Sequence, residues 1–250
     1  MDGIGRLGHD SPHGPNADWR VLTTADAAGT NGLTCLPKHG GTRDRRFLVT
    51  HPMTDHCETG HCLSGCEMWA DRIDAFGGNE DYTSKLAVYR KVMRIRVHSE
   101  YDERTVSNDI GLALVNRNFD LNNNVKRLIV PVQFPNYKTG TVAGWGVTNN
   151  WSGGTRVLKS VAQNIRTPDI CRAIYGFKSG MLCAGSKEKN VDQPASGDSG
   201  SALVSSNYQQ VGMGLVSYKD MRWPALIVYS NLTYYHRWIT TYSKALYCNY

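Results

Sequence analysis

The chain has 250 residues, enough for one large domain or two smaller ones. Its hydrophobic share of 40% excludes a largely disordered protein, and its net charge of +6 is too diffuse to indicate a nucleic-acid binder. No apolar run reaches the ~20 residues of a membrane-spanning helix.

Short apolar runs between turn signals recur along the chain and predict β-strands. In order, they cover residues 18–24, 46–50, 87–97, 110–115, 128–132, 141–146, 157–165, 201–205, 211–217 and 227–230. Such regular spacing predicts an all-β sandwich or barrel. A C-terminal helix is predicted over residues 233–246, with Tyr234, Trp238, Tyr242 and Leu246 along one face, and a shorter one over 168–175.

The run over residues 87–97 alternates between apolar and basic side chains, which is typical of a half-buried strand. We expect the apolar set on the core face, namely Ala87, Tyr89, Met93, Ile95 and Val97. The opposite face carries Arg90, Arg94 and Arg96. It is interpreted as a solvated surface, with a contact site for an anionic polymer as the alternative.

Seven cysteines indicate an oxidising compartment and a secreted protein, with one thiol left over by the odd count. Two glycosylation acceptors, Asn150 and Asn231, agree with secretion. The first twenty residues contain no apolar signal region, so we expect either a leader outside this sequence or a different compartment.

Ser199 lies between Gly197 and Gly200, beside Asp198, and just before an apolar run. A nucleophilic serine needs an exposed hydroxyl on a tight turn, with backbone N–H groups aimed at the developing negative oxygen. Glycine permits both the close approach and the unusual backbone angles of such a turn. Taken alone, this pattern also fits an ordinary structural turn.

A serine nucleophile requires a base, and the base requires an acid that fixes its tautomer. We select His56 among the 8 histidines, because it follows an apolar strand and precedes Cys57, which could be bridged to Cys35. Asp109 heads the apolar run that follows it, where an acid must be paired to be tolerated. The alternatives are His51 or His61 as the base, and a capping or turn acid at Asp109.

Three blocks of sequence carry a family resemblance: Thr-Asp-His-Cys at 54–57, Asp-Ile-Gly-Leu-Ala-Leu from Asp109, and Gly-Asp-Ser-Gly from Gly197. In this order they resemble the signature blocks of the chymotrypsin/trypsin family of serine endopeptidases. Residues 142–146, 181–185, 214–218 and 235–239 resemble further strands and the terminal helix of that family.

The resemblance implies two Greek-key antiparallel β-barrels packed face to face, with a C-terminal α-helix. Residues 1–118 would form the barrel that carries His56 and Asp109, and residues 119–250 the barrel that carries Ser199. The Asn-rich stretch over 116–124 agrees with a boundary there. The expected partners are protein or peptide substrates and serine-protease inhibitors, without a cofactor, a metal or nucleic acid.

By the same resemblance, Ser199 is the nucleophile, His56 the general base and then acid, and Asp109 its orienter. The N–H groups of Gly197 and Ser199 would form the oxyanion hole. Ser217 would support Asp109, Tyr218 would lie on the strand along which substrate is laid, and Lys219 would stand near the entrance of the specificity pocket.

The implied disulfides pair Cys35 with Cys57, Cys62 with Cys66, and Cys171 with Cys183, which leaves Cys248 alone. The alternative is a zinc site that uses His56, Cys57, His61, Cys62 and Cys66, because nitrogen and sulfur ligands are close together in this segment.

The specificity pocket departs from the family pattern. Gln193 stands where trypsins have an aspartate that binds Lys or Arg, Ala195 replaces a cysteine, and Lys219 replaces a glycine. Ile227 would narrow a wall of the pocket. We therefore expect little cleavage after Lys or Arg, and a preference for small or acidic residues.

The start of the chain departs from the family as well. In the family, a freed N-terminus pairs with the acid that corresponds to Asp198, as a zymogen becomes active. No Ile-Val-Gly-Gly-like start is present here, so Ile4 is the candidate for that freed N-terminus. A further departure is an insertion over residues 51–53, which bears on the placement of His56. These departures motivate the alternative of a catalytically silent homologue that binds a protein partner.

Overall fold

The computed structural model describes residues 24–26, 29–31, 34–35, 47–50, 74–102, 104–120, 122, 124–125, 128, 130–134, 136, 138–148, 154–188, 191–195, 197–205, 210–215 and 223–248. Its strands are β1 (Thr24–Asp26), β2 (Gly29–Asn31), β3 (Thr34–Cys35), β4 (Phe47–Thr50), β5 (Asp74–Gly77), β6 (Val88–Val97), β7 (Gly111–Val115), β8 (Thr139–Gly144), β9 (Lys159–Asn164), β10 (Met181–Gly185), β11 (Ala202–Val204), β12 (Gln210–Leu215) and β13 (Leu226–Asn231). Its helices are α2 (Pro168–Arg172) and α3 (His236–Cys248).

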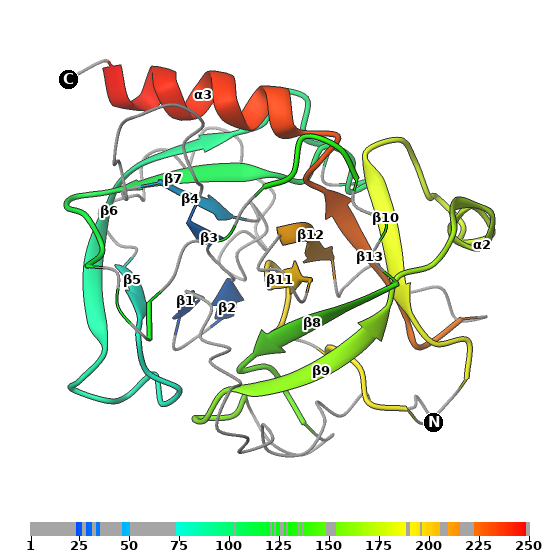
Figure 1. Ribbon diagram of the computed structural model, residues 1–250, viewed down its shortest axis with the longest axis horizontal. Helices are drawn as coiled ribbons and strands as arrows, with labels where there is room; N and C mark the ends of the chain where they lie inside the picture. Colours follow the sequence, from blue (N-terminus) through cyan, green and yellow to red (C-terminus); the bar gives the residue numbers. More distant parts are fainter. Residues whose placement is uncertain are drawn as a thin grey trace.

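The strands form two large antiparallel sheets and one small one. A 5-stranded sheet has the order β3-β4-β7-β6-β5, a 6-stranded sheet the order β10-β13-β12-β11-β8-β9, and β1 pairs with β2. The two large sheets lie side by side, and α3 runs across one end of the molecule over β6 and β7 (Figure 1). The predicted all-β fold with a C-terminal helix is confirmed, and the boundary near residue 118 stays a prediction.

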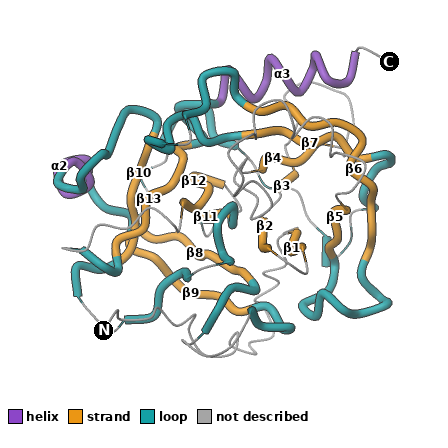
Figure 2. Tube along the Cα trace, turned by 180° about the vertical axis from the view of Figure 1, so that it is seen from behind, coloured by secondary structure: helices purple, strands orange, loops and turns teal. Residues whose placement is uncertain are grey.

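Strand β7 separates two hydrophobic clusters, because successive side chains of a strand point to opposite faces. Leu112 and Leu114 pack with Tyr235 and Ile239 beneath α3. On the other face, two further residues of β7 pack in a second cluster: Ala113 and Val115, with Ala75, Val92, Phe119 and Val125. The strand is buried along its whole length, and the helix closes one side of this sheet (Figure 2).

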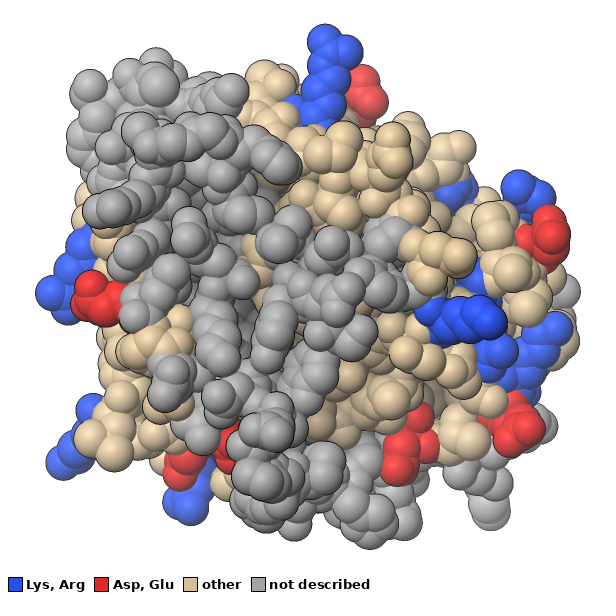
Figure 3. Space-filling model, viewed as in Figure 1, with Lys and Arg blue, Asp and Glu red and all other residues tan. Residues whose placement is uncertain are grey.

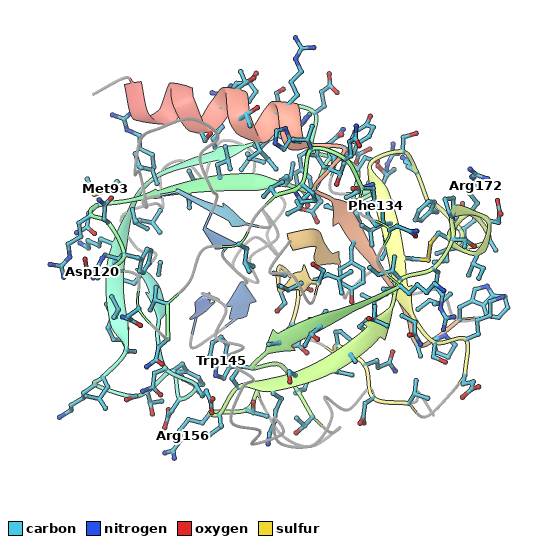
Figure 4. The ribbon with its side chains drawn as sticks, in the orientation of Figure 1. Met93, Asp120, Phe134, Trp145, Arg156 and Arg172 are labelled. Carbon is cyan, nitrogen blue, oxygen red and sulfur yellow. A yellow bond between two sulfur atoms is a disulfide. The ribbon has the colours of Figure 1, made fainter. Side chains whose placement is uncertain are left out.

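The predicted faces of the 87–97 strand are wrong at Tyr89, Arg90 and Met93, whereas Ala87 is buried as expected. Arg90 is buried, at 5% exposure, whereas Tyr89 and Met93 are 47% and 45% exposed. The Arg90 guanidinium donates to the carbonyl oxygens of Asn118 and Tyr89, at 2.8 and 2.7 Å, and lies over the Phe119 ring. The long-range partners Asn118 and Phe119 allow the cation to point inward, which the local alternation of side chains could not indicate. Met93 lies on the outer rim of the molecule (Figure 4).

The proposed basic surface therefore loses Arg90. A register shift between Val92 and Arg94 then changes the face that the later residues occupy. Arg96 lies over the ring of Tyr242 on α3, 4.7 Å from its centroid. Across the visible face, Lys and Arg alternate with Asp and Glu among the described residues (Figure 3). The three arginines do not form one solvated basic face.

Two other expectations need correction. No strand forms at the described residues of the 128–132 run, although Leu128 and Val130 are buried at 3% and 4% exposure. Helix α3 begins at His236 rather than at residue 233, because the Asn231 side-chain oxygen accepts the N–H groups of the next turn. Ile239 on the helix and Tyr235 just before it are buried, while Tyr234 is 58% exposed.

The predicted disulfide between Cys171 and Cys183 is confirmed, and it ties α2 to β10 with a Cα–Cα distance of 5.6 Å. The prediction for Cys57, Cys62 and Cys66 lies outside the described residues, and of Cys35 and Cys248 the backbone alone is described. No helix in the described part of the chain is long and apolar enough to span a membrane.

The indole of Trp145, at the end of β8, joins the two halves of the molecule. Its Nε1–H donates to the carbonyl of Glu80 at 2.8 Å, and that carbonyl also accepts the N–H of Leu158 at 2.9 Å. The ring packs with Ala87 and Tyr82 (Figure 4). The 80–87 loop is thus held against the second large sheet.

Candidate active site

Ser199 lies on a tight turn between β10 and β11. Both flanking glycines have left-handed backbone angles, with φ of 89° at Gly197 and 86° at Gly200. L-residues with a side chain rarely adopt these angles, so the sequence needs glycine at both positions. The serine itself is half-buried. The local sequence therefore produces a tight turn at Ser199.

The buried carboxylate of Asp198 holds this turn in place. Its side chain is fully buried, and its two oxygens accept the N–H groups of Gly146 and Ala195 at 2.9 Å each. Its backbone N–H donates to the Ala195 carbonyl, and its carbonyl accepts the Ser201 N–H, both at 3.0 Å. A buried carboxylate is tolerated where backbone donors satisfy it in this way.

The Gly-Trp-Gly segment makes room for that carboxylate. A Cβ placed on Gly146 would lie 2.5 Å from the Asp198 Cγ, and one on Gly144 would collide with Asp198 Oδ1. Both glycines are therefore needed at the end of β8, next to the serine turn. The contact of Gly146 with Asp198 joins residues that are 52 positions apart, so the local sequence does not indicate it.

Asp109 lies directly before β7 and is fully buried. The hydroxyl of Ser230, on β13, donates to the Asp109 carbonyl oxygen at 2.7 Å. The preceding residue, Asn108, has a left-handed φ of 54°, and its carbonyl accepts the Ile110 N–H at 2.9 Å. Asp109 is therefore the central residue of a tight turn, and the Ser230 hydrogen bond attaches this turn to the 6-stranded sheet.

Strand β13 connects the acid with the serine turn. Ser230 contacts Asp109. The adjacent Tyr229 is fully buried, and burial is the main cause that raises the pKa of its phenol, followed by the charge of Asp198. The end of β13 meets the start of β7 beneath α3 (Figure 1). Adjacent residues of one strand thus interact with two acids that are far apart in sequence.

The structure describes only some of the predicted site residues. His56, Ser217, Tyr218 and Lys219 lie outside the described residues, as do all the residues of the alternative zinc site. Among the residues that are described, no group of three or more His, Cys, Asp and Glu side chains could hold a metal ion.

Gln193, the predicted floor of the specificity pocket, is 3% exposed. Among the described residues, its side-chain oxygen has no hydrogen-bond partner, and neither has the hydroxyl of the buried Tyr229. Ala195 is buried beside Asp198, and Ile227 is fully buried in the cluster that contains Tyr229. The described residue at the predicted pocket floor is therefore neutral, and the buried charge nearby is that of Asp198, which accepts two backbone N–H groups.

The sequence did not indicate three residues that hold the Asp109 turn, namely Asn108, Ser230 and Tyr235. Their contacts with this turn cross 121 residues from Ser230 to Asp109 and 127 residues from Tyr235 to Asn108. The available signal was local: an asparagine directly before a buried acid is a residue type that tolerates left-handed angles.

Comparison with known proteins agrees with this geometry. The family model described as Trypsin matches residues 58–239. Trypsin-1 of Astacus astacus is 31% identical over 197 residues, which cover 72% of this chain and 80% of that protein. Chymase of Canis lupus familiaris is 30% identical over 206 residues, covering 80% and 76%. Chymotrypsin of Phaedon cochleariae is 26% identical over 229 residues, covering 87% and 75%.

The matched region contains Asp109, Ser199 and the strands that hold them, and the family's fold is a pair of β-barrels, in agreement with the two large sheets. The chain therefore belongs to the trypsin family of serine peptidases.

Proposed function

We propose that this chain is a serine endopeptidase that hydrolyses peptide bonds through an acyl-enzyme on Ser199. The observation that carries the proposal is the serine turn, which has left-handed glycines on both sides and a buried carboxylate bonded to two backbone N–H groups. Forming such a turn costs backbone entropy at the glycines and the desolvation free energy of a carboxylate. An ordinary surface loop needs neither.

In the proposed mechanism, His56 accepts the Ser199 hydroxyl proton while the serine oxygen attacks the carbonyl carbon of the substrate. The N–H groups of Gly197 and Ser199 stabilise the negative oxygen of the tetrahedral intermediate. His56 then donates the proton to the leaving amine, and the C–N bond breaks. Water, activated by His56, releases the acyl group and restores the serine.

Asp109 would orient the His56 imidazole and stabilise its protonated form. Its complete burial supports this role, because a carboxylate shielded from water acts strongly on a neighbouring cation. The turn that holds it, attached to Ser230, supports the fixed geometry that such an orienter needs.

For specificity, we propose that side chains other than Lys and Arg occupy the primary pocket. The buried, neutral Gln193 supports this, because the positive charge of a basic side chain would lie there without a counter-ion. We further propose an oxidising, extracellular location, supported by the Cys171–Cys183 disulfide.

A peptide-library digest tests the proposed activity and specificity together. Purified full chain, before and after removal of residues 1–3, should cleave peptides, with few cuts after Lys or Arg. The Ser199→Ala variant should cleave none. A dominant preference for basic residues would overturn the interpretation of Gln193, and equal cleavage by Ser199→Ala would overturn the mechanism. If neither form cleaves any peptide, the silent homologue becomes the better account.

A further inference from the structure

We propose that Tyr235 is a positioning residue for Asp109: its hydroxyl holds the Asn108 side chain, and through it the tight turn that carries the acid. The inference rests on the proposed function, since it needs Asp109 to orient His56. It assigns a role in the reaction to the segment that leads into the C-terminal helix.

The hydrogen bonds of Asn108 support this assignment. Its side-chain oxygen accepts the Tyr235 hydroxyl at 3.1 Å, and its side-chain nitrogen donates to the Glu100 carbonyl at 2.9 Å. Its own backbone is left-handed, an angle that residues with a side chain adopt when their surroundings hold them there. The side chain is therefore fixed at both ends, and its backbone leads directly into Asp109.

Tyr235 is rigid enough to act as such a brace. Its side chain is 3% exposed and packs beneath α3 with Leu112 and Leu114 of β7. Its ring contacts His98 edge-on, with 5.8 Å between ring centroids. Its hydroxyl lies over Gly180, where a Cβ would be 2.5 Å from the phenol oxygen. The brace therefore connects α3, β7 and the start of β10 (Figure 2).

The phenol remains a donor over the working pH range. Burial is the main cause that raises the pKa of Tyr235, followed by its neighbour Tyr234 and the Asp109 carboxylate. A protonated hydroxyl that donates to Asn108, the residue adjacent to the acid, suits a residue that positions the carboxylate without contacting substrate.

Removing the hydroxyl should affect the chemical step more than substrate binding. Without the Tyr235 bond, Asn108 can leave its left-handed angle and carry the Asp109 carboxylate with it. Ser230 still holds the Asp109 carbonyl, so the displacement is partial. A displaced carboxylate stabilises protonated His56 less, which lowers the pKa of the base as well as the rate.

The test compares Tyr235→Phe with Tyr234→Phe, which removes the hydroxyl of the adjacent tyrosine, 58% exposed. We expect Tyr235→Phe to lower kcat and the rate of Ser199 labelling by a fluorophosphonate about three- to tenfold, the range that corresponds to one buried hydrogen bond. KM should stay within about twofold, and the acid limb of the pH–rate profile should move to lower pH. Tyr234→Phe should match the wild type in all four measurements.

A second variant removes the acceptor instead of the donor. Asn108→Gly accepts the left-handed angle but loses the side-chain bonds, so it should lower kcat as Tyr235→Phe does. The double variant should be no slower than the slower single variant, because both act through one contact. Loss of thermal stability with a wild-type kcat and acid limb in both single variants would overturn the inference. Failure of the wild type itself to label at Ser199 would overturn the proposed function instead.

Discussion

Replacing Asp198 with asparagine tests whether the serine turn depends on a buried carboxylate. Each oxygen of Asp198 accepts one backbone N–H, from Gly146 and from Ala195, at 2.9 Å. An asparagine offers one oxygen, so its NH2 group must face one of these donors. A buried donor left unpaired costs about 1–3 kcal/mol, and the lost bond to a charged acceptor contributes about 1.5–3 kcal/mol.

Removing a buried charge offsets part of this loss, because the carboxylate no longer has to be desolvated. We therefore expect the free energy of unfolding to fall by about 2–3 kcal/mol. We also expect slower labelling of Ser199 by a fluorophosphonate, since the turn that carries the serine loses one of its supports. Urea denaturation and the labelling rate measure the two effects separately.

Asp192→Asn is the matched control, because Asp192 is exposed and lies close to Asp198 in the sequence. It should unfold at the wild-type urea concentration and label at the wild-type rate. The reasoning is refuted if Asp198→Asn behaves like Asp192→Asn in both measurements.

Three further predictions concern the framework around the site. Trp145→Phe keeps an aromatic ring but removes the N–H donor to Glu80 and part of the buried indole, so stability to urea should fall by at least about 1 kcal/mol. Replacing both Cys171 and Cys183 with serine removes a disulfide between residues 12 apart in sequence. Urea denaturation should then show a loss of about 2–3 kcal/mol in the free energy of unfolding. Burial lowers the pKa of His98 below its usual 6.5 in the folded protein, so His98 binds a proton more readily in the unfolded chain. The free energy of unfolding should therefore fall as the pH drops through 6.5 toward the lowered pKa. Urea titrations at a series of pH values should show a weaker pH dependence for His98→Asn. An unchanged slope of the unfolding free energy against pH in that variant would contradict the prediction.

The parts of the fold that follow from local patterns could be predicted from the sequence. Continuous apolar runs predicted the buried strands β7, β11 and β13, and all their described residues except the terminal Asn231 are buried. The glycines around Ser199 predicted a tight turn, and their left-handed angles agree. In each case, the residues that determine the structure are neighbours in the sequence.

Features that depend on distant partners could not be predicted. Arg90 faces inward because Asn118 and Phe119 receive its guanidinium, and nothing in the alternation of β6 indicates them. The turn of Asp109 is held by Ser230 and, through Asn108, by Tyr235, which come from the far end of the chain. The fold brings these residues together, so the sequence could indicate the acid but not what holds it.

The most direct test of the central claim is covalent labelling of the full chain with a fluorophosphonate, followed by mass spectrometry of its peptides. The proposal predicts one adduct, on Ser199, which disappears when the protein is unfolded in urea before labelling and when His56 is replaced with alanine. An unmodified Ser199, both before and after Ile4 is exposed as the N-terminus, would contradict the assignment of this chain as an active serine endopeptidase.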